Sequence, residues 1–171
     1  MMWASENKYD EIISKKASKY NVPIALVKAV IAKESSFNPK AYKAEPQISD
    51  ASRGLMQVLF RTAKGLGFKG ADPAMLFDPT INIEFGTALL AENLKRTGGK
   101  VDAAIAAYNA GWSKVRANDA PRKPDNTFVN QSYVNDVQVY YAYFAGKVTE
   151  PELKEYAKSK TWAGGTLPVF F

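Results

Sequence analysis

The sequence contains neither cysteine nor histidine among its 171 residues. The absence of cysteine excludes disulfides, thiolate nucleophiles and cysteine-ligated metals. The absence of histidine excludes a Ser-His-Asp triad, a histidine general base and imidazole metal sites. Acid–base chemistry therefore falls to aspartate, glutamate, lysine or tyrosine.

Long apolar runs are missing as well. No stretch approaches the roughly 20 apolar residues that span a membrane, and residues 1–6 lack the apolar core of a signal peptide. We therefore expect only peripheral contact with a membrane or envelope. The chain is expected to be a mature or trimmed form, or to be exported by another route such as phage delivery.

The composition that remains is that of a globular protein, with 46% hydrophobic and 23% charged residues. The length fits one domain over residues 1–171 better than two. The net charge of +6 favours a polyanionic partner: nucleic acid, anionic lipid or bacterial cell wall. Nucleic acid is not expected, because the lysines are scattered along predicted helices and are not clustered with exposed aromatic residues.

Apolar residues at helical spacing predict a mainly α-helical fold. Helices are predicted at 9–20, at 24–34, and from 79 to the glycine pair at 98–99. Further helices are predicted at 102–110, where Asp102 would cap the first turn, at 133–145, and after a capping box at 149–152. Residues 36–53 show no clear period and predict a long loop or a short β-hairpin, and a short helix is predicted near 62–64. The tail at 161–171 is predicted to be extended.

Glu34 lies on the apolar face of the second predicted helix. A charged carboxylate there loses favourable hydration energy unless it is paired with a cation or becomes protonated, and burial therefore raises its pKa. A carboxyl that stays protonated near neutral pH is what a general acid requires. The alternative is that Glu34 ends the helix and reaches water, or pairs with a nearby lysine or arginine.

Three motifs occur in order: Lys-Glu-Ser-Ser-Phe-Asn-Pro at 33–39, Gly-Leu-Met-Gln at 54–57 and Ala-Ala-Tyr-Asn-Ala-Gly at 106–111. Together they resemble the lytic transglycosylase family of the lysozyme-like superfamily. Segments 78–83 and 133–137 add to this resemblance, which gives a family core at roughly 20–146, with a C-terminal helix and tail at 149–171. It implies a single, monomeric, lysozyme-like helical domain with a cleft.

The resemblance also implies a role for each matching residue. Glu34 corresponds to the family's catalytic acid/base, and the tyrosine of the third motif is expected to point at it. Substrate contact is predicted for Ser35, Met56, Gln57, Tyr108, Asn109 and Tyr133. Without the resemblance, Met56 would be taken as a core residue, and Tyr108 as a core tyrosine bonded to a carbonyl.

Two features depart from the family pattern. Residues 129–132 read Val-Asn-Gln-Ser, where the family usually has Glu-Thr-Arg just before the tyrosine at 133. The segment 42–50 is longer than the usual family loop. The family's cleft serine is therefore either Ser49 or Ser52.

The family mechanism implies that Glu34 protonates the β-1,4 bridge between MurNAc and GlcNAc and then removes the proton of the MurNAc C6 hydroxyl, which closes a 1,6-anhydro ring. This reaction requires no metal or cofactor. The implied partner is peptidoglycan, and the implied location is the cell envelope or periplasm.

Two other functions are weighed against it. A goose-type lysozyme shares the fold but uses aspartates to activate water, one of them two positions after the motif glutamine, where this chain has Leu59. Asp50 in the long loop is the candidate that would restore such a hydrolase. A non-catalytic wall-binding module is the other alternative, and the intact Glu34 argues against it.

Overall fold

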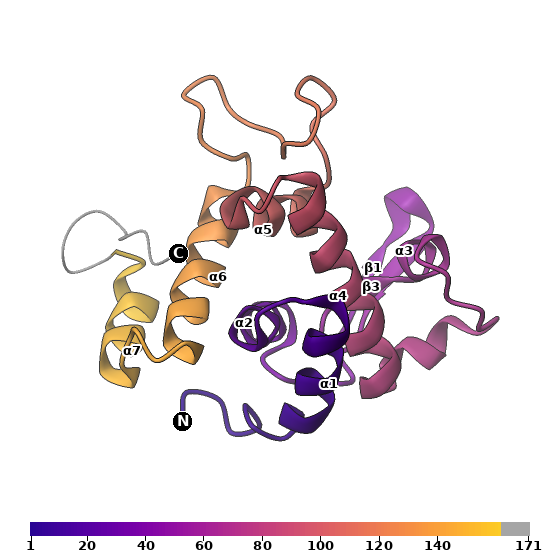
Figure 1. The fold of residues 1–171 in the computed structure, drawn as a ribbon, viewed down its shortest axis with the longest axis horizontal. Helices are drawn as coiled ribbons and strands as arrows, with labels where there is room; N and C mark the ends of the chain where they lie inside the picture. Colours follow the sequence, from indigo (N-terminus) through magenta and orange to yellow (C-terminus); the bar gives the residue numbers. More distant parts are fainter. Residues whose placement is uncertain (162–171) are drawn as a thin grey trace.

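The computed structural model describes residues 1–161, and its centre is helix α2 (Ile24–Ser35). Around α2 lie α1 (Asp10–Tyr20), α4 (Pro79–Arg96), α5 (Val101–Ala110) and α6 (Gln131–Phe144) (Figure 1). Every residue of α2 from Leu26 to Ala32 is buried. A helix with apolar residues on all sides is stable only when it is surrounded, which explains its central place.

Lys28 is the one charged residue inside this buried stretch of α2. Its ammonium donates to Asp10 Oδ1 at 2.8 Å and to Asn7 Oδ1 at 2.9 Å. It also lies 5.0 Å from the ring centre of Phe144. The buried charge is thus paired and hydrogen-bonded, as burial of a charge requires.

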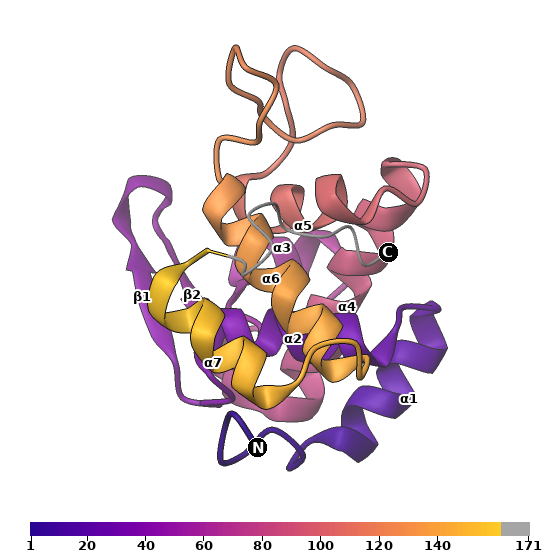
Figure 2. The ribbon, with the colours of Figure 1, turned by 90° about the vertical axis from the view of Figure 1, so that its left-hand side faces the viewer.

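A small antiparallel sheet follows α2, with strands β1 (Tyr42–Glu45), β2 (Asp50–Arg53) and β3 (Val58–Leu59) in that order. The short 3₁₀ turn η1 (Pro46–Ile48) joins β1 to β2. Figure 2 shows this hairpin at the side of the helical body. The short hairpin considered for residues 36–53 is therefore present.

Two short helices lead from the sheet to α4. Helix α3 (Phe60–Gly65) starts directly after β3, and the 3₁₀ helix η2 (Pro73–Phe77) precedes α4. Asp78 caps α4 by accepting a hydrogen bond from the main-chain nitrogen of Ile81 at 3.0 Å. The prediction of a mainly helical fold with a small hairpin is confirmed.

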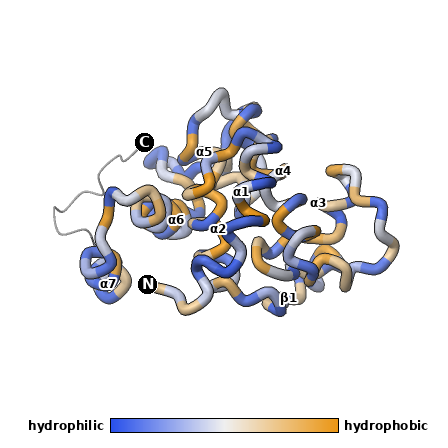
Figure 3. Tube along the Cα trace, turned by 60° about the horizontal axis from the view of Figure 1, so that its bottom comes forward, coloured by the Kyte–Doolittle hydropathy of each residue, from blue (hydrophilic) through white to orange (hydrophobic). Residues whose placement is uncertain are grey.

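Helix α7 (Glu150–Ser159) packs on the outer side of α6 through Leu153 and Tyr156, and most of its residues are hydrophilic (Figure 3). Its predicted capping box is formed, because Thr149 and Glu152 each accept a hydrogen bond from the other's main-chain nitrogen. Of the tail predicted to be extended, residues 162–171 lie outside the described part of the chain.

The start of α5 corrects one expectation. The helix begins at Val101 after Lys100, one residue earlier than predicted. Asp102 therefore lies inside the first turn, and its carboxylate accepts from the main-chain nitrogen of Ala103 at 2.7 Å and caps nothing. No helix within residues 1–161 is both long enough and apolar enough to cross a membrane.

Candidate active site

Glu34 lies in the last turn of α2, half-buried, at the point where the chain leaves the helix. Its carboxylate oxygen Oε1 accepts a hydrogen bond of 2.5 Å from the hydroxyl of Tyr133 on α6. The next residue, Ser35, donates its hydroxyl to the carbonyl of Leu55 at 2.7 Å. The end of α2 is thus attached both to α6 and to the turn that follows β2.

Burial raises the pKa of Glu34 from 4.5 to about 7. The hydrogen bond from Tyr133 and the positive charges of Lys33 and Lys43 oppose this rise without cancelling it. The C-terminal end of a helix carries partial negative charge, which also disfavours a carboxylate there. Both protonation states of Glu34 are therefore accessible near neutral pH, as a group that acts as acid and then as base requires.

Glu34 opens into a cleft with a volume of about 610 Å³. The residues around it come from the hairpin, from the segment after β2, and from α4 and the end of α5. They are Glu34, Lys43, Glu45, Gln47, Ile48, Ser52, Gln57, Val58, Leu59, Thr62, Leu89, Tyr108, Asn109, Ala110 and Gly111. Of the two serines left open by the sequence, Ser52 is the one at the cleft.

The turn at 54–57 is held by Asn82, a fully buried residue of α4. Its amide nitrogen donates to the carbonyls of Arg53 and Leu76, and its oxygen accepts from the main-chain nitrogen of Met56, all at 2.7 Å. Gly54 has a φ of 76°, and a Cβ there would overlap the Asn82 amide. Only glycine fits this close approach.

Three of the residues predicted to contact substrate line the cleft with Glu34, namely Gln57, Tyr108 and Asn109. Gln57 is fixed by hydrogen bonds from its amide to the carbonyls of Ala41 and Gly54. Asn109 is exposed and accepts a 3.0 Å hydrogen bond from the amide of Asn130, just before α6. This bond connects the ends of the two helices beside the cleft.

The side chain of Met56 corrects the prediction that it contacts sugar. It is completely buried and packs against Gly86 of α4, where a larger residue would overlap it. The space left by the glycine draws the methionine into the core and away from the cleft. Only the main chain of Met56 takes part in building the site.

Tyr108 follows the alternative given for it, a tyrosine bonded to a carbonyl. Its hydroxyl donates to the carbonyl of Met56 at 2.7 Å, and the hydroxyl that bonds to Glu34 is that of Tyr133. Burial and the nearby Glu34 both raise the pKa of Tyr108 well above its usual range. Tyr133 and Ser35 are not among the residues that line the cleft; their hydroxyls bond to Glu34 and to the carbonyl of Leu55.

Asp50 is not one of the residues around the cleft, because its carboxylate is engaged elsewhere. It accepts from the main-chain nitrogens of Ala51 at 2.7 Å and Arg61 at 3.0 Å, and it pairs with Arg53 at 3.1 Å. Desolvation works against its charge, but these hydrogen bonds keep the pKa of Asp50 below its usual value. Its role is to hold the start of α3 against β2.

The sequence alone missed the second carboxylate that does line the cleft, Glu45 on β1. It accepts from the Gln47 amide at 2.8 Å and pairs with Lys43 at 3.2 Å. Lys43 and Glu45 are two residues apart on a strand, so they share a face. This alternation of side chains along the strand was the sequence signal that could have placed Glu45 on the same face as Lys43. Within residues 1–161, no three acidic side chains gather closely enough to hold a metal ion.

Comparisons with known proteins identify the family of the chain. The family model described as the transglycosylase SLT domain matches residues 11–131. The chain belongs to this family. The match includes α2 with Glu34, the hairpin and the end of α5, so the predicted family is confirmed, while Tyr133 lies just beyond it.

Relatives of the family come from bacteria and a phage. The transglycosylase of Enterobacteria phage PRD1 is 41% identical over 105 residues, which cover 61% of this chain and 36% of that protein. The soluble lytic murein transglycosylase of Escherichia coli K12 is 31% identical over 156 residues, covering 81% and 23%. The crystal structure of the 70-kDa soluble lytic transglycosylase from Escherichia coli has a TM-score of 0.66 at 26% identity, covering 81% of this chain and 24% of that one. The matched parts therefore cover between 23% and 36% of the length of these proteins.

Proposed function

We propose that this chain is a peptidoglycan lytic transglycosylase. It cleaves the β-1,4 bond between MurNAc and GlcNAc and forms 1,6-anhydroMurNAc, with Glu34 as both acid and base. The observation that carries the proposal is a half-buried Glu34 at the cleft with a pKa of about 7. Sequence and structural relatives named as lytic transglycosylases support it. The cell envelope is then the proposed place of action.

In the first step, the protonated carboxyl of Glu34 gives its proton to the bridging oxygen as the bond from that oxygen to C1 of MurNAc breaks. GlcNAc leaves as an alcohol, and positive charge develops on the MurNAc ring. Tyr133 donates to Oε1, so the transferable proton resides on Oε2. This hydrogen bond fixes the direction in which the acid delivers its proton.

In the second step, the Glu34 carboxylate takes the proton of the C6 hydroxyl of the same sugar, while the C6 oxygen bonds to C1. The nucleophile belongs to the reacting sugar, which gives it a high effective concentration. Atoms and charge balance without water, and Glu34 ends the cycle protonated as it began. Gln57 and Asn109 lie around the cleft where they can position the sugar.

The competing reaction is hydrolysis with inversion, which needs a second carboxylate to activate water. The sequence made Asp50 the candidate, but its carboxylate is engaged by main-chain nitrogens and Arg53. Glu45 at the cleft is the specific observation that favours this alternative. Hydrogen bonds from Gln47 and Lys43 lower the pKa of Glu45, so it is charged at neutral pH.

Mass spectrometry of the products from purified peptidoglycan distinguishes these functions. The wild type is expected to release anhydro-muropeptides, Glu34→Gln to release none, and Glu45→Gln to release the same products as the wild type. Reducing-end products that disappear in Glu45→Gln would establish the hydrolase instead. A wild type that binds peptidoglycan but releases nothing would reduce the chain to a binding module. Circular dichroism of each variant verifies that it is folded.

A further inference from the structure

A second pocket, with a volume of about 490 Å³, lies at the other end of α4 from the sheet. The last turn of α4, the turn into α5 and the loop at 112–130 surround it. Its charged residues are Lys95, Arg96, Lys100, Arg116, Arg122 and Asp119. Five positive side chains thus meet a single carboxylate.

The carboxylate of Asp119 already forms an ion pair with Arg122, through contacts of 2.7 and 3.2 Å. Within residues 1–161, the other four cations of the pocket form no ion pair. Lys95 and Arg96 have a structural reason to be at this place, because cations stabilise the C-terminal end of a helix. Lys100 and Arg116 come from other segments and do not lie in the last turn of a helix.

The guanidinium groups of the pocket are held in place. Arg96 lies over the ring of Trp112, 3.9 Å from its centre. Arg122 lies over the ring of Phe128, also at 3.9 Å. Arg116 donates to the side-chain oxygen of Asn126 at 2.8 Å. Each group keeps further N–H donors for a ligand, because a guanidinium carries five.

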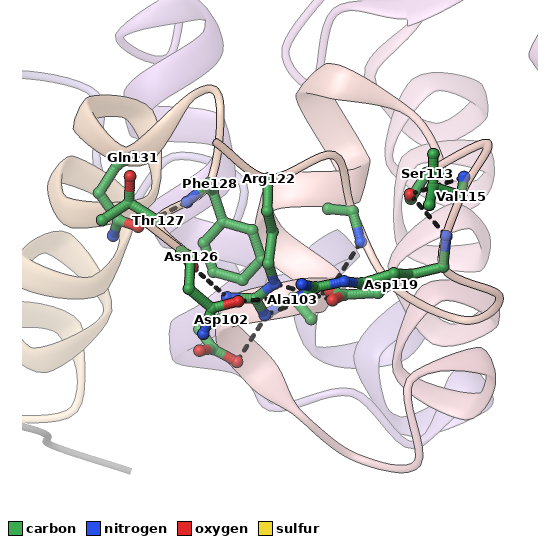
Figure 4. Close-up of polar contacts among 12 residues, drawn as sticks. Asp102, Ala103, Ser113, Val115, Asp119, Arg122, Asn126, Thr127, Phe128 and Gln131 are labelled. Carbon is green, nitrogen blue, oxygen red and sulfur yellow. Dashed lines mark hydrogen bonds and ion pairs between the residues drawn. The ribbon is translucent and has the colours of Figure 1, made fainter. Parts of the chain in front are cut away.

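The loop at 112–130 fixes these positions through its own contacts. It extends beyond the helical body in Figures 1 and 2. Main-chain hydrogen bonds of 2.8 Å join Ser113 to Asp119 and Lys123 to Thr127. Figure 4 shows the Arg122 side chain directed at Asp119 and lying beside the Phe128 ring. Arg116 and Arg122 are therefore positioned before any ligand arrives.

We propose that this pocket binds phosphate groups. Rigid guanidiniums match phosphate oxygens in a bidentate manner, and lysines add charge without geometric demand. A phosphate offers several oxygens to donors that approach from different segments, as they do here. Leu89 at the catalytic cleft and Lys95 at this pocket are both on α4, about 9 Å apart along the helix axis. A phosphate-bearing polymer or surface held here would keep the cleft near the envelope.

Titration calorimetry with inorganic phosphate tests the proposal without reference to catalysis. The matched variants are Lys100→Gln/Arg116→Gln in the pocket and Lys8→Gln/Lys69→Gln at exposed sites away from it, which remove the same charge. We expect saturable binding by the wild type, weakened about tenfold in the pocket variant and less than about twofold in the control. Thermal unfolding of both variants is compared with that of the wild type.

Two further arms identify the source of the phosphate. Poly(glycerol phosphate) that binds more tightly per phosphate than inorganic phosphate would indicate an envelope polymer. Selective binding to phosphatidylglycerol vesicles would indicate a lipid headgroup. Absence of saturable binding, or equal weakening in the pocket and control variants, would overturn the proposal, since net charge alone would then explain the attraction. The single variant Lys100→Gln, at an exposed position, decides the matter if the double variant does not fold.

Discussion

Replacing Glu34 by glutamine removes the titrating carboxyl and keeps an oxygen that can accept the hydrogen bond from Tyr133. Because burial raises the pKa of Glu34 from 4.5 to about 7, the folded wild type binds a proton that the unfolded chain has lost between these two values. The free energy of unfolding therefore falls as the pH rises through this window. The glutamine variant does not carry this penalty.

The magnitude follows from the pKa difference between the two states. About 2.5 pKa units correspond to about 3 kcal/mol. Near pH 4 the carboxyl is protonated in both states, so this contribution vanishes, and by about pH 8 nearly all of it is present. At about 2 to 4 °C per kcal/mol for a chain of this length, Glu34→Gln should raise Tm by roughly 6 to 12 °C at pH 8 and hardly change it at pH 4.

Thermal unfolding followed by circular dichroism at several pH values measures this difference. Glu92→Gln, at an exposed position of α4, is the control, and its Tm should follow that of the wild type at every pH. A Glu34→Gln variant whose advantage is independent of pH, or absent at pH 8, would refute the claim that burial holds Glu34 protonated near neutral pH. The catalytic assignment would then lose its electrostatic basis.

Two more predictions concern the support of the site. Tyr133→Phe removes the hydrogen bond that lowers the pKa of Glu34, so the alkaline limb of the pH–activity profile should move to higher pH. We also expect kcat to fall roughly 10- to 100-fold, because the acid is no longer held in place. An alkaline limb at the same pH as in the wild type would show that the bond does not act on Glu34. Asn82→Ala leaves three buried main-chain groups unpaired, and the free energy of unfolding should fall by about 3 to 5 kcal/mol in urea titrations. A loss below about 1 kcal/mol would show that the turn at 54–57 is held in another way.

The helices could be predicted because periodic apolar residues and capping signals lie within each segment. Asp78 and the Thr149–Glu152 capping box are local features, and both act as expected. The position of Glu34 at the end of α2 followed from the same periodicity. The ordered motifs then predicted part of the cleft lining, including Gln57 and Asn109.

The remaining features depend on partners far away in the sequence. Met56 turns into the core because Gly86, on another helix, leaves space for it. Tyr108 bonds to the main-chain carbonyl of Met56, as the alternative interpretation of this tyrosine had it, while Tyr133 on α6 makes the contact with Glu34. Glu45 reaches the cleft only because the hairpin pairs in its observed register.

The most direct test of the central claim is the digestion of peptidoglycan in water enriched in oxygen-18. In transglycosylation the C6 hydroxyl of MurNAc attacks C1, so no oxygen from water enters the product. We expect anhydro-muropeptides without the heavy isotope, formed by the wild type and not by Glu34→Gln. One oxygen-18 atom at C1 of the released MurNAc would show that water is the nucleophile and would contradict the account.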